Sequence, residues 1–383
     1  MKDTNARYVW LDVLRFLAIF LVVCSHCCDP FNLAPDAKNN PDYGFWGALY
    51  GSIFRPCVPL FVMMTGLLLL PLKNGVSPGN FYKKRILRVL VPFLVWSLLY
   101  NLFPWITGLL GGDKTMVGIF FPYSVAYDNV PSLALSDVLV NILRIPFNFS
   151  LYAVHMWYIY MLIGLYLFMP FFSAWIEKYS RKTTEMFLVI WGITLFLPYA
   201  YQYISTYFWG TCSWNAFGML YYFAGFNGYL LLGYYLNKYN TLNLSKTVLL
   251  AIPLFAIGYA ITFSGFRSMT IHPEASEEMI ELFWTYCSPN VLIMTIALFM
   301  IGQKVVINSL FWQKTLANLT QCGLGIYMVH YFFVGIGFLA AQKMALPVPL
   351  LVPVAAMIVF SISWLVVALA YKLNAKTARW VMG

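Results

Sequence analysis

Stretches of mostly apolar residues, each long enough to cross a bilayer, alternate with polar connections along the chain. A helix rises about 1.5 Å per residue, so about 20 apolar residues span the hydrocarbon core of a membrane. The pattern therefore predicts an all-α fold, a polytopic transmembrane helical bundle of about ten spans. We expect these spans near residues 9–28, 47–71, 87–110, 155–175, 185–204, 218–236, 247–265, 284–302, 317–340 and 349–371.

Most connections between the spans are short, but a semi-polar one covers 111–154 and a polar one covers 266–283. Leu133 to Leu143, within the first of these, predicts a short interfacial or re-entrant helix. No stretch indicates a separate soluble domain, so we expect one transmembrane domain over residues 1–383. The first span is expected to be uncleaved, because no small-residue cleavage site follows it.

Composition supports this class and excludes a soluble domain. Of the 383 residues, 61% are hydrophobic and 10% are charged, and the mean hydropathy is +0.73. A net charge of +10 would suggest nucleic acid as a partner of a soluble protein. Here most basic residues lie in short loops between apolar spans, which is the pattern of membrane orientation. We therefore expect no nucleic-acid partner.

The loop charges predict an N-in, C-in topology, because cytoplasmic loops carry the excess of lysine and arginine. With the N-terminus inside, the cytoplasmic segments hold seventeen of the 24 basic residues: Lys2, Arg7, Lys73, Lys83, Lys84, Arg85, Arg88, Lys178, Arg181, Lys182, Lys238, Lys246, Lys304, Lys314, Lys372, Lys376 and Arg379.

Two ionisable residues, Arg15 and His26, lie on one face of the first span. Eleven helical steps return to within about 20° of the starting direction and climb about 17 Å. Asp12 and Asp29 each lie three residues from one of them, which is pairing distance on a helix. Ionisable groups inside a membrane helix tend to mark a functional path. The alternative is a structural ion pair at each helix end.

A basic cluster precedes the third span, in Tyr82-Lys-Lys-Arg-Ile-Leu-Arg88. Arg85 and Arg88 are three residues apart and share one helical face, and Lys84 adjoins them. Two guanidinium groups there could hold a phosphate in bidentate fashion. The alternative is that these residues anchor the loop to anionic membrane lipid.

Further polar residues lie towards the outer face or deep in a span. Arg55 lies several residues inside the second span, so we expect it to face a polar cavity. Glu281 opens the eighth span and could be an interfacial charge. His155 could belong to an aromatic belt at the membrane surface. His330 lies deep in the ninth span and could be a buried hydrogen-bonding residue.

A phosphate-binding cluster at the inner face and an acid–base cluster in the outer half fit a donor with a phosphorylated head and a long arm. Acyl-coenzyme A is such a molecule. The seven cysteines show no metal-ligand spacing, so we expect no metal.

Five segments carry a family resemblance in their order along the chain: Leu11 to Arg15 with His26, Val58 to Gly66, Lys83 to Arg88, His155 to Tyr158, and Gly323 to His330. Together they resemble the acyltransferase-3 family of integral membrane O-acyltransferases, over nearly the whole chain. Thr65 and Gly323 stand where the family has serine, and the spacing at His155 is shifted by one residue. The enterobacterial-common-antigen type is nearest, because of Glu281 to Pro289 and the short C-terminus.

The resemblance implies a multi-pass enzyme of the bacterial inner (plasma) membrane. It would transfer acetyl from cytoplasmic acetyl-CoA to a hydroxyl of a surface polysaccharide, or of its lipid-linked precursor, at the outer face. His26 would act as general base or as nucleophile, since an imidazole titrates near neutral pH. Asp29 would orient its ring, with Glu281 as a rival, and Arg55 would stabilise the oxyanion.

Two further groups of residues follow from the resemblance. Arg15, Lys84, Arg85 and Arg88 would bind the acyl-CoA, and the candidate substrate contacts are Asp12, His155, Trp157 and His330.

Three alternatives stay open. The first is a transporter of a lipid-linked sugar or small anion, although no inverted repeat is visible. The second keeps the enzyme but changes the acceptor to a lysolipid or a small amphiphile. The third changes the acyl group to succinyl or a longer chain.

Overall fold

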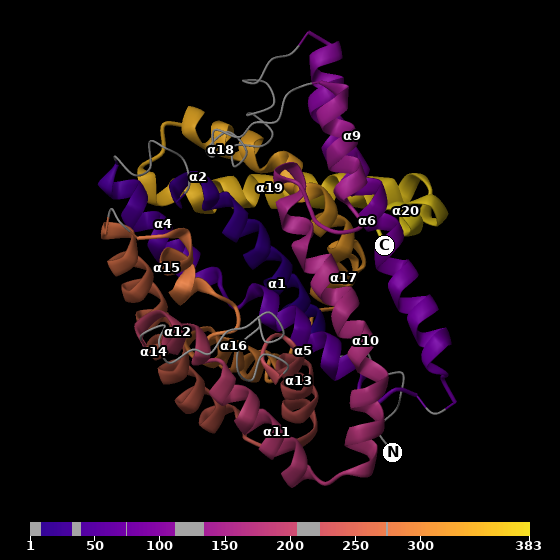
Figure 1. Cartoon of the computed structure of the whole chain (residues 1–383), viewed down its shortest axis with the longest axis vertical. Coiled ribbons are helices and arrows are strands. Elements are labelled where there is room, and N and C mark those ends of the chain that lie inside the picture. The colour runs from indigo at the N-terminus through magenta and orange to yellow at the C-terminus, as the bar shows by residue number, and fades with distance from the viewer. Residues whose placement is uncertain (1–8, 33–39, 74, 112–133, 205–222, 273–274) are drawn as a thin grey trace. The chain divides into compact units, whose positions relative to one another are not determined.

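The computed structural model describes residues 9–32, 40–73, 75–111, 134–204, 223–272 and 275–383. These ranges are built from helices and contain no strand, which confirms the all-α prediction (Figure 1). Within them, nine helical stretches are long and apolar enough to cross a membrane: Val9–Asn32, Pro41–Leu69, Pro78–Leu109, Leu151–Lys178, Arg181–Tyr203, Leu244–Ile271, Glu278–Gly302, Leu310–Lys343 and Val348–Leu373.

These nine stretches correspond to nine of the ten predicted spans. The predicted span at 218–236 is represented by α13 (Asn227–Tyr239), which has 13 residues. Its N-terminal part lies outside the described residues. The short helix predicted within 111–154 is α9 (Leu135–Arg144), whose Leu135, Leu139 and Leu143 are exposed on one face. An exposed apolar face on a short helix is typical of an interfacial element.

The described chain divides into two compact units, each assembled from segments far apart in sequence. Unit 1 comprises Met1–Ala18, Arg55–Pro78 and Leu165–Ile307, and unit 2 comprises Ile19–Phe54, Gly79–Gly164 and Asn308–Gly383. The divisions fall inside α1 (Val9–Cys27) and α10 (Trp157–Lys178), so both helices contribute to both units. The expectation of one transmembrane domain over the whole chain stays a prediction.

Unit 1 is organised by close helix crossings at glycine. The crossing of α5 (Cys57–Leu69) with α13 brings the two backbones into contact. A Cβ at Gly66 would lie 1.9 Å from the Leu230 carbonyl oxygen, and one at Gly233 would lie 2.0 Å from that of Met63. Small residues permit this approach, which is how membrane helices commonly associate. The other elements of unit 1 are α11 (Arg181–Thr194), α12 (Leu197–Tyr203), α14 (Leu244–Ile271), α15 (Glu277–Glu281), η4 (Leu282–Trp284) and α16 (Pro289–Gly302).

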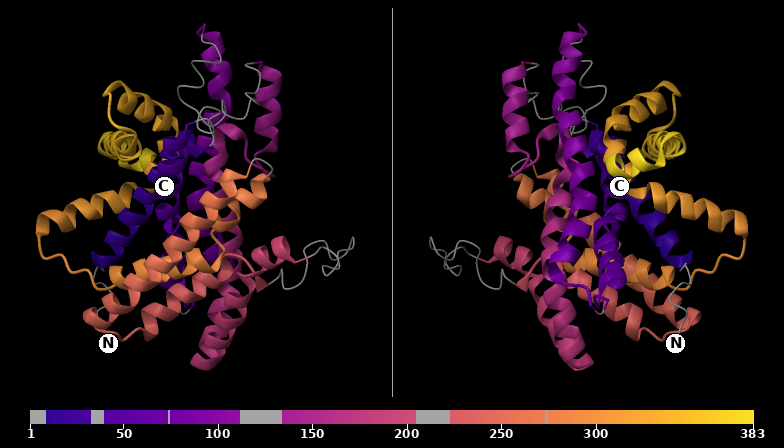
Figure 2. Two further views of the ribbon diagram at one scale, coloured as in Figure 1. Left: turned by 90° about the vertical axis from the view of Figure 1, so that its left-hand side faces the viewer. Right: turned by 90° about the vertical axis from the view of Figure 1, so that its right-hand side faces the viewer.

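Unit 2 contains α6 (Pro78–Leu109), a helix of 32 residues (purple in Figure 2). It continues through Pro92 and Pro104. Proline is tolerated inside transmembrane helices because neighbouring groups satisfy the freed backbone carbonyls. The remaining elements are α2 (Asp29–Asn32), α4 (Pro41–Phe54), α9, η1 (Leu151–Met156), α17 (Leu310–Val329), η5 (His330–Phe333), α18 (Val334–Lys343), α19 (Val348–Leu373) and α20 (Ala375–Val381).

The long helix α19 is the packing centre for the C-terminal half of unit 2. Both α17 and α18 pack against it. Phe20 of α1 meets Phe360 of α19 edge to face, with ring centroids 5.4 Å apart. Tyr50 of α4 donates a hydrogen bond to the Pro349 carbonyl oxygen at 2.7 Å. The helix η5 also packs against α19.

Candidate functional site

Three histidines from distant parts of the chain form one cluster in unit 2. His26 lies in the last turn of α1, His155 lies in η1 and His330 begins η5. The ring centroid of His330 is 5.3 Å from that of His26 and 5.3 Å from that of His155. The His26 and His155 centroids are 6.3 Å apart. We call His26, His155 and His330 the histidine cluster.

His26 is paired with Asp29, as the three-residue spacing predicts. His26 Nδ1 lies 3.0 Å from Asp29 Oδ2, across the break between α1 and α2. A carboxylate oxygen only accepts, so Nδ1 carries the proton and the neutral ring keeps its lone pair on Nε2. The His26 and Asp29 side chains are 20% and 19% exposed, so the pair is partly accessible. This geometry suits a general base whose ring is held by a carboxylate.

His330 presents a second lone pair to the cluster. Its ring is fully buried, and Nδ1 donates to the Tyr327 carbonyl oxygen at 2.7 Å. Nδ1 therefore carries the proton, and Nε2 is an acceptor. Within the described part of the chain Nε2 has no hydrogen-bond partner. A buried polar atom without a partner is uncommon, and water or a ligand satisfies such atoms in many structures.

His155 is buried inside the unit, and so does not belong to an aromatic belt at the membrane surface. It is 1% exposed, and its ring stacks on Tyr331, with centroids 4.8 Å apart and planes at 25°. Neither ring nitrogen has a hydrogen-bond partner among the residues described. Its backbone carbonyl accepts a hydrogen bond from the Tyr327 hydroxyl. Three unsatisfied imidazole nitrogens, counting that of His330, therefore lie in one buried region.

Tyrosines around the histidine cluster were not predicted from the sequence. Tyr100 of α6 meets the His155 ring edge to face at 5.0 Å and donates to the Met328 carbonyl oxygen at 2.8 Å. Tyr327 lies three residues before His330, a spacing that could have indicated it. Tyr331 follows His330 directly, and adjacent residues do not share a helical face, so its place beside the His155 ring had no local signal. No local signal indicates Tyr100, because its contact depends on how α6 packs.

Arg55 belongs to unit 1, at the turn between α4 and α5. Its guanidinium carbon lies 4.2 Å from the centroid of the Trp284 ring and 5.5 Å from that of Tyr286. Trp284 in turn stacks on Phe266, with centroids 3.4 Å apart. Cation–π contacts of this kind hold a guanidinium in a fixed plane. Glu281, at the end of α15, is exposed. The roles of Arg55 and Glu281 beside His26 stay predictions.

Asp12 and Arg15 form the other predicted pair on α1. Arg15 Nη1 lies 3.3 Å from Asp12 Oδ1, and Asp12 is buried. Because α1 is continuous from Val9 to Cys27, Arg15 and His26 share one helix, as predicted. This contact fits a purely structural ion pair at the end of α1 as well as it fits a role for Asp12 in substrate binding.

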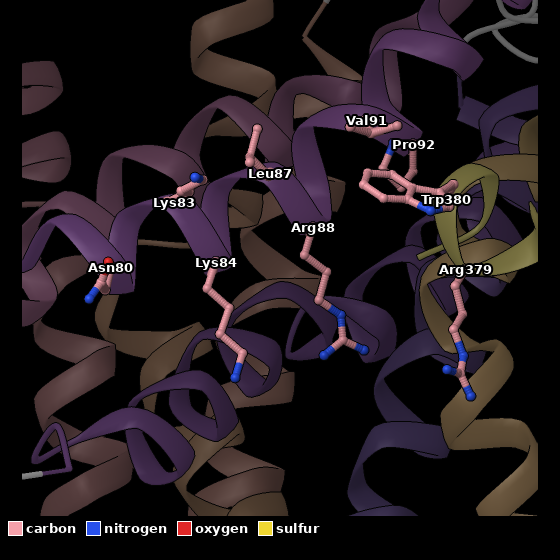
Figure 3. Close-up of a pocket in the computed structure, with 9 residues that line it drawn as sticks. All are labelled: Asn80, Lys83, Lys84, Leu87, Arg88, Val91, Pro92, Arg379 and Trp380. Carbon is pink, nitrogen blue, oxygen red and sulfur yellow. The ribbon is translucent and has the colours of Figure 1, made fainter. Parts of the chain in front are cut away.

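Lys84 and Arg88 line one pocket beside α6, and Arg85, which is partly buried, is not among its lining residues (Figure 3). Lys84 and Arg88 are one turn apart on the exposed side of the helix. Trp157 is half-buried at the start of α10. In the described ranges, no group of three or more histidine, cysteine or acidic side chains could hold a metal ion.

A family model described as an acyltransferase domain matches residues 8–368. The chain therefore belongs to the acyltransferase-3 family, and the match runs through both units. It is a membrane acyltransferase. No curated protein and no solved structure matched the chain.

Proposed function

We propose that this protein transfers an acetyl group from cytoplasmic acetyl-CoA to a hydroxyl of a surface polysaccharide, or of its lipid-linked precursor, at the outer face of a bacterial inner membrane. The observation that carries the proposal is the His26–Asp29 pair beside the two buried histidines. Membership of an acyltransferase family favours this chemistry over the transporter alternative.

The reaction needs one base and one proton donor. His26 Nε2 takes the proton of the acceptor hydroxyl as the oxygen attacks the thioester carbonyl. The carbon–sulfur bond then breaks, and the proton passes to the leaving thiolate, so the products are the ester and free coenzyme A. Asp29 stabilises the imidazolium that forms in between. In the variant with an acetyl-imidazole intermediate, Nε2 attacks the thioester first and the carbon–sulfur bond breaks, releasing the thiolate. The acceptor hydroxyl then takes the acetyl group from the ring, and its proton ends on the thiolate.

The buried nitrogens of His155 and His330 supply further polar contacts for this step. Each lies in a ring beside His26 and has no hydrogen-bond partner among the residues described. An acceptor hydroxyl can donate to an imidazole lone pair, which would hold the sugar close to Nε2 of His26. Arg55 would stabilise the oxyanion, and Lys84 and Arg88, which line one pocket, would hold the phosphates of the donor.

The test uses sealed vesicles that carry lipid-linked glycan from the native host in the leaflet of the outer face, with acetyl-CoA labelled in the acetyl group added outside the vesicles. With N-in, C-in topology, inside-out vesicles expose the donor side, so they should release thiol and label the glycan, whereas right-side-out vesicles should not. Thiol release without glycan label would overturn the acceptor and leave the acyltransferase in place. Neither signal, with no acetyl-CoA binding, would favour transport.

A further inference from the structure

A pocket on unit 2 brings basic residues of α6 together with the C-terminal helix α20. It has a volume of about 450 Å³ and is lined by Asn80, Lys83, Lys84, Leu87, Arg88, Val91, Pro92, Arg379 and Trp380 (Figure 3). This volume is in the range of small-molecule sites, about 300–1,000 Å³. Four of the lining residues are cations and none is a carboxylate, so the pocket favours an anion. We call it the α6–α20 pocket.

Specific contacts hold α20 in place against its neighbours in the unit. The Asn374 side chain caps its first turn, accepting from the backbone of Lys376 at 3.1 Å and of Thr377 at 3.0 Å. Trp96 of α6 donates from Nε1 to the Val381 carbonyl oxygen at 2.9 Å. A Cβ at Gly325 of α17 would lie 3.0 Å from that of Met382. The backbone of α20 is therefore docked against α6 and α17.

Two consecutive residues of α20, Arg379 and Trp380, line the pocket, one with a guanidinium group and the other with an indole ring. The Arg379 side chain extends in the same direction as those of Lys84 and Arg88, from the facing helix (Figure 3). The Trp380 ring lies at the same pocket with Val91 and Pro92, and 57% of the residue is exposed. Three cations and an indole at one pocket match the phosphates and the base of a nucleotide, because indole rings stack on bases and guanidinium groups bind phosphate.

We propose that α20 completes a site for the adenosine 3′,5′-bisphosphate end of the acyl donor, in which Trp380 stacks on the adenine and Arg379 joins Lys84 and Arg88 on the phosphates. This rests on the proposed use of an acyl-CoA. Both α20 residues lie beyond residue 368, where the family match ends. An anionic lipid headgroup shares the phosphate chemistry but offers no base to stack. The exposed indole therefore favours the nucleotide.

The test measures binding of adenosine 3′,5′-bisphosphate to the full-length protein in phosphatidylcholine nanodiscs by calorimetry. Trp380→Ala should raise the Kd about tenfold through loss of stacking. Arg379→Ala should raise it about tenfold through loss of a charge-assisted hydrogen bond. Trp380→Phe keeps an aromatic face and should bind nearly as the wild type does. Lys376→Ala removes an exposed cation of α20 outside the pocket lining and should leave the Kd unchanged.

Three outcomes would overturn the proposal. If Trp380→Ala and Arg379→Ala bind the bisphosphate as the wild type does, α20 takes no part, and the proposed acyl-CoA chemistry is untouched. If the variants bind the bisphosphate as the wild type does but retain less phosphatidylglycerol in a second set of nanodiscs that contains this lipid, the pocket is a lipid site. If the wild type binds neither the bisphosphate nor acetyl-CoA, both this proposal and the proposed donor fail. A thermal melt of each variant separates loss of contact from loss of fold.

Discussion

His26 and Asp29 form a hydrogen-bonded pair across the break between α1 and α2, with His26 Nδ1 and Asp29 Oδ2 3.0 Å apart. The carboxylate determines the tautomer of the ring, which leaves the lone pair on Nε2. The pair is partly exposed, whereas His155 and His330 beside it are buried. His26 is therefore an oriented and accessible base, and the ring nitrogens of His155 and His330 are buried near it.

Asp29→Asn should abolish most transfer while leaving the fold intact. An asparagine amide can donate to Nδ1, which would move the proton of the ring to Nε2 and remove the base. The corresponding change in a Ser-His-Asp triad costs about 10⁴-fold in kcat, and we expect a loss of about 10²-fold or more here. Steady-state kinetics with acetyl-CoA should show an unchanged KM. Asp42→Asn, at an exposed acid of α4, is the matched control. An Asp29→Asn enzyme with full kcat would remove Asp29 from the mechanism.

His330→Asn tests the buried Nε2. The asparagine amide can replace the Nδ1 donor to the Tyr327 carbonyl oxygen, so the melting temperature should change little. It supplies no acceptor at the position of Nε2. If that lone pair holds the acceptor hydroxyl, kcat should fall by about 10²-fold. Wild-type turnover with an unchanged melting temperature would show that Nε2 of His330 takes no part in the transfer.

Arg55 should not be replaceable by lysine. A guanidinium stacks on the Trp284 ring as a plane, whereas an ammonium on a flexible stem does not keep that orientation. Arg55→Lys should therefore lower kcat by about 10²-fold, the loss typical of one oxyanion donor. Arg55→Leu should be at least as inactive. Equal activity of Arg55→Lys and wild type would mean that charge alone suffices, and the planar contact with Trp284 would have no part in catalysis.

Gly66→Ala should destabilise unit 1. The added methyl group would lie 1.9 Å from the Leu230 carbonyl oxygen, so α5 and α13 would have to separate. Overpacking of this kind costs about 1–3 kcal/mol of unfolding free energy. Gly192→Ala, on α11 of the same unit, meets nothing within 4 Å and should be neutral or slightly stabilising. Thermal unfolding in detergent compares the two, and equal melting temperatures would contradict the close crossing.

The parts of the fold and site that depend on local spacing could be predicted from the sequence. Hydrophobic runs predicted the spans, and three-residue spacing predicted both the Asp12–Arg15 and the His26–Asp29 pairs. The position of His26 and Arg15 on one helix follows from the same periodicity.

The rest depends on contacts between distant segments, which a single sequence does not encode locally. His155 and His330 are 175 residues apart, and nothing in either segment indicates that their rings meet at 5.3 Å. From the sequence, Arg379 was assigned only to the basic residues that orient the chain in the membrane. Its position at the α6–α20 pocket was missed, because that position depends on how α20 docks. Tyr100 was missed for the same reason.

The most direct test of the central claim compares the wild type, His26→Ala and His272→Ala in inside-out vesicles that carry lipid-linked glycan in the lumenal leaflet and are supplied with labelled acetyl-CoA. His272 is an exposed histidine after α14 and lies outside the histidine cluster, so its loss controls for a general effect of removing an imidazole. We predict that wild type and His272→Ala label the glycan and release thiol at similar rates, and that His26→Ala does neither. Transfer by His26→Ala at the wild-type rate would contradict the account.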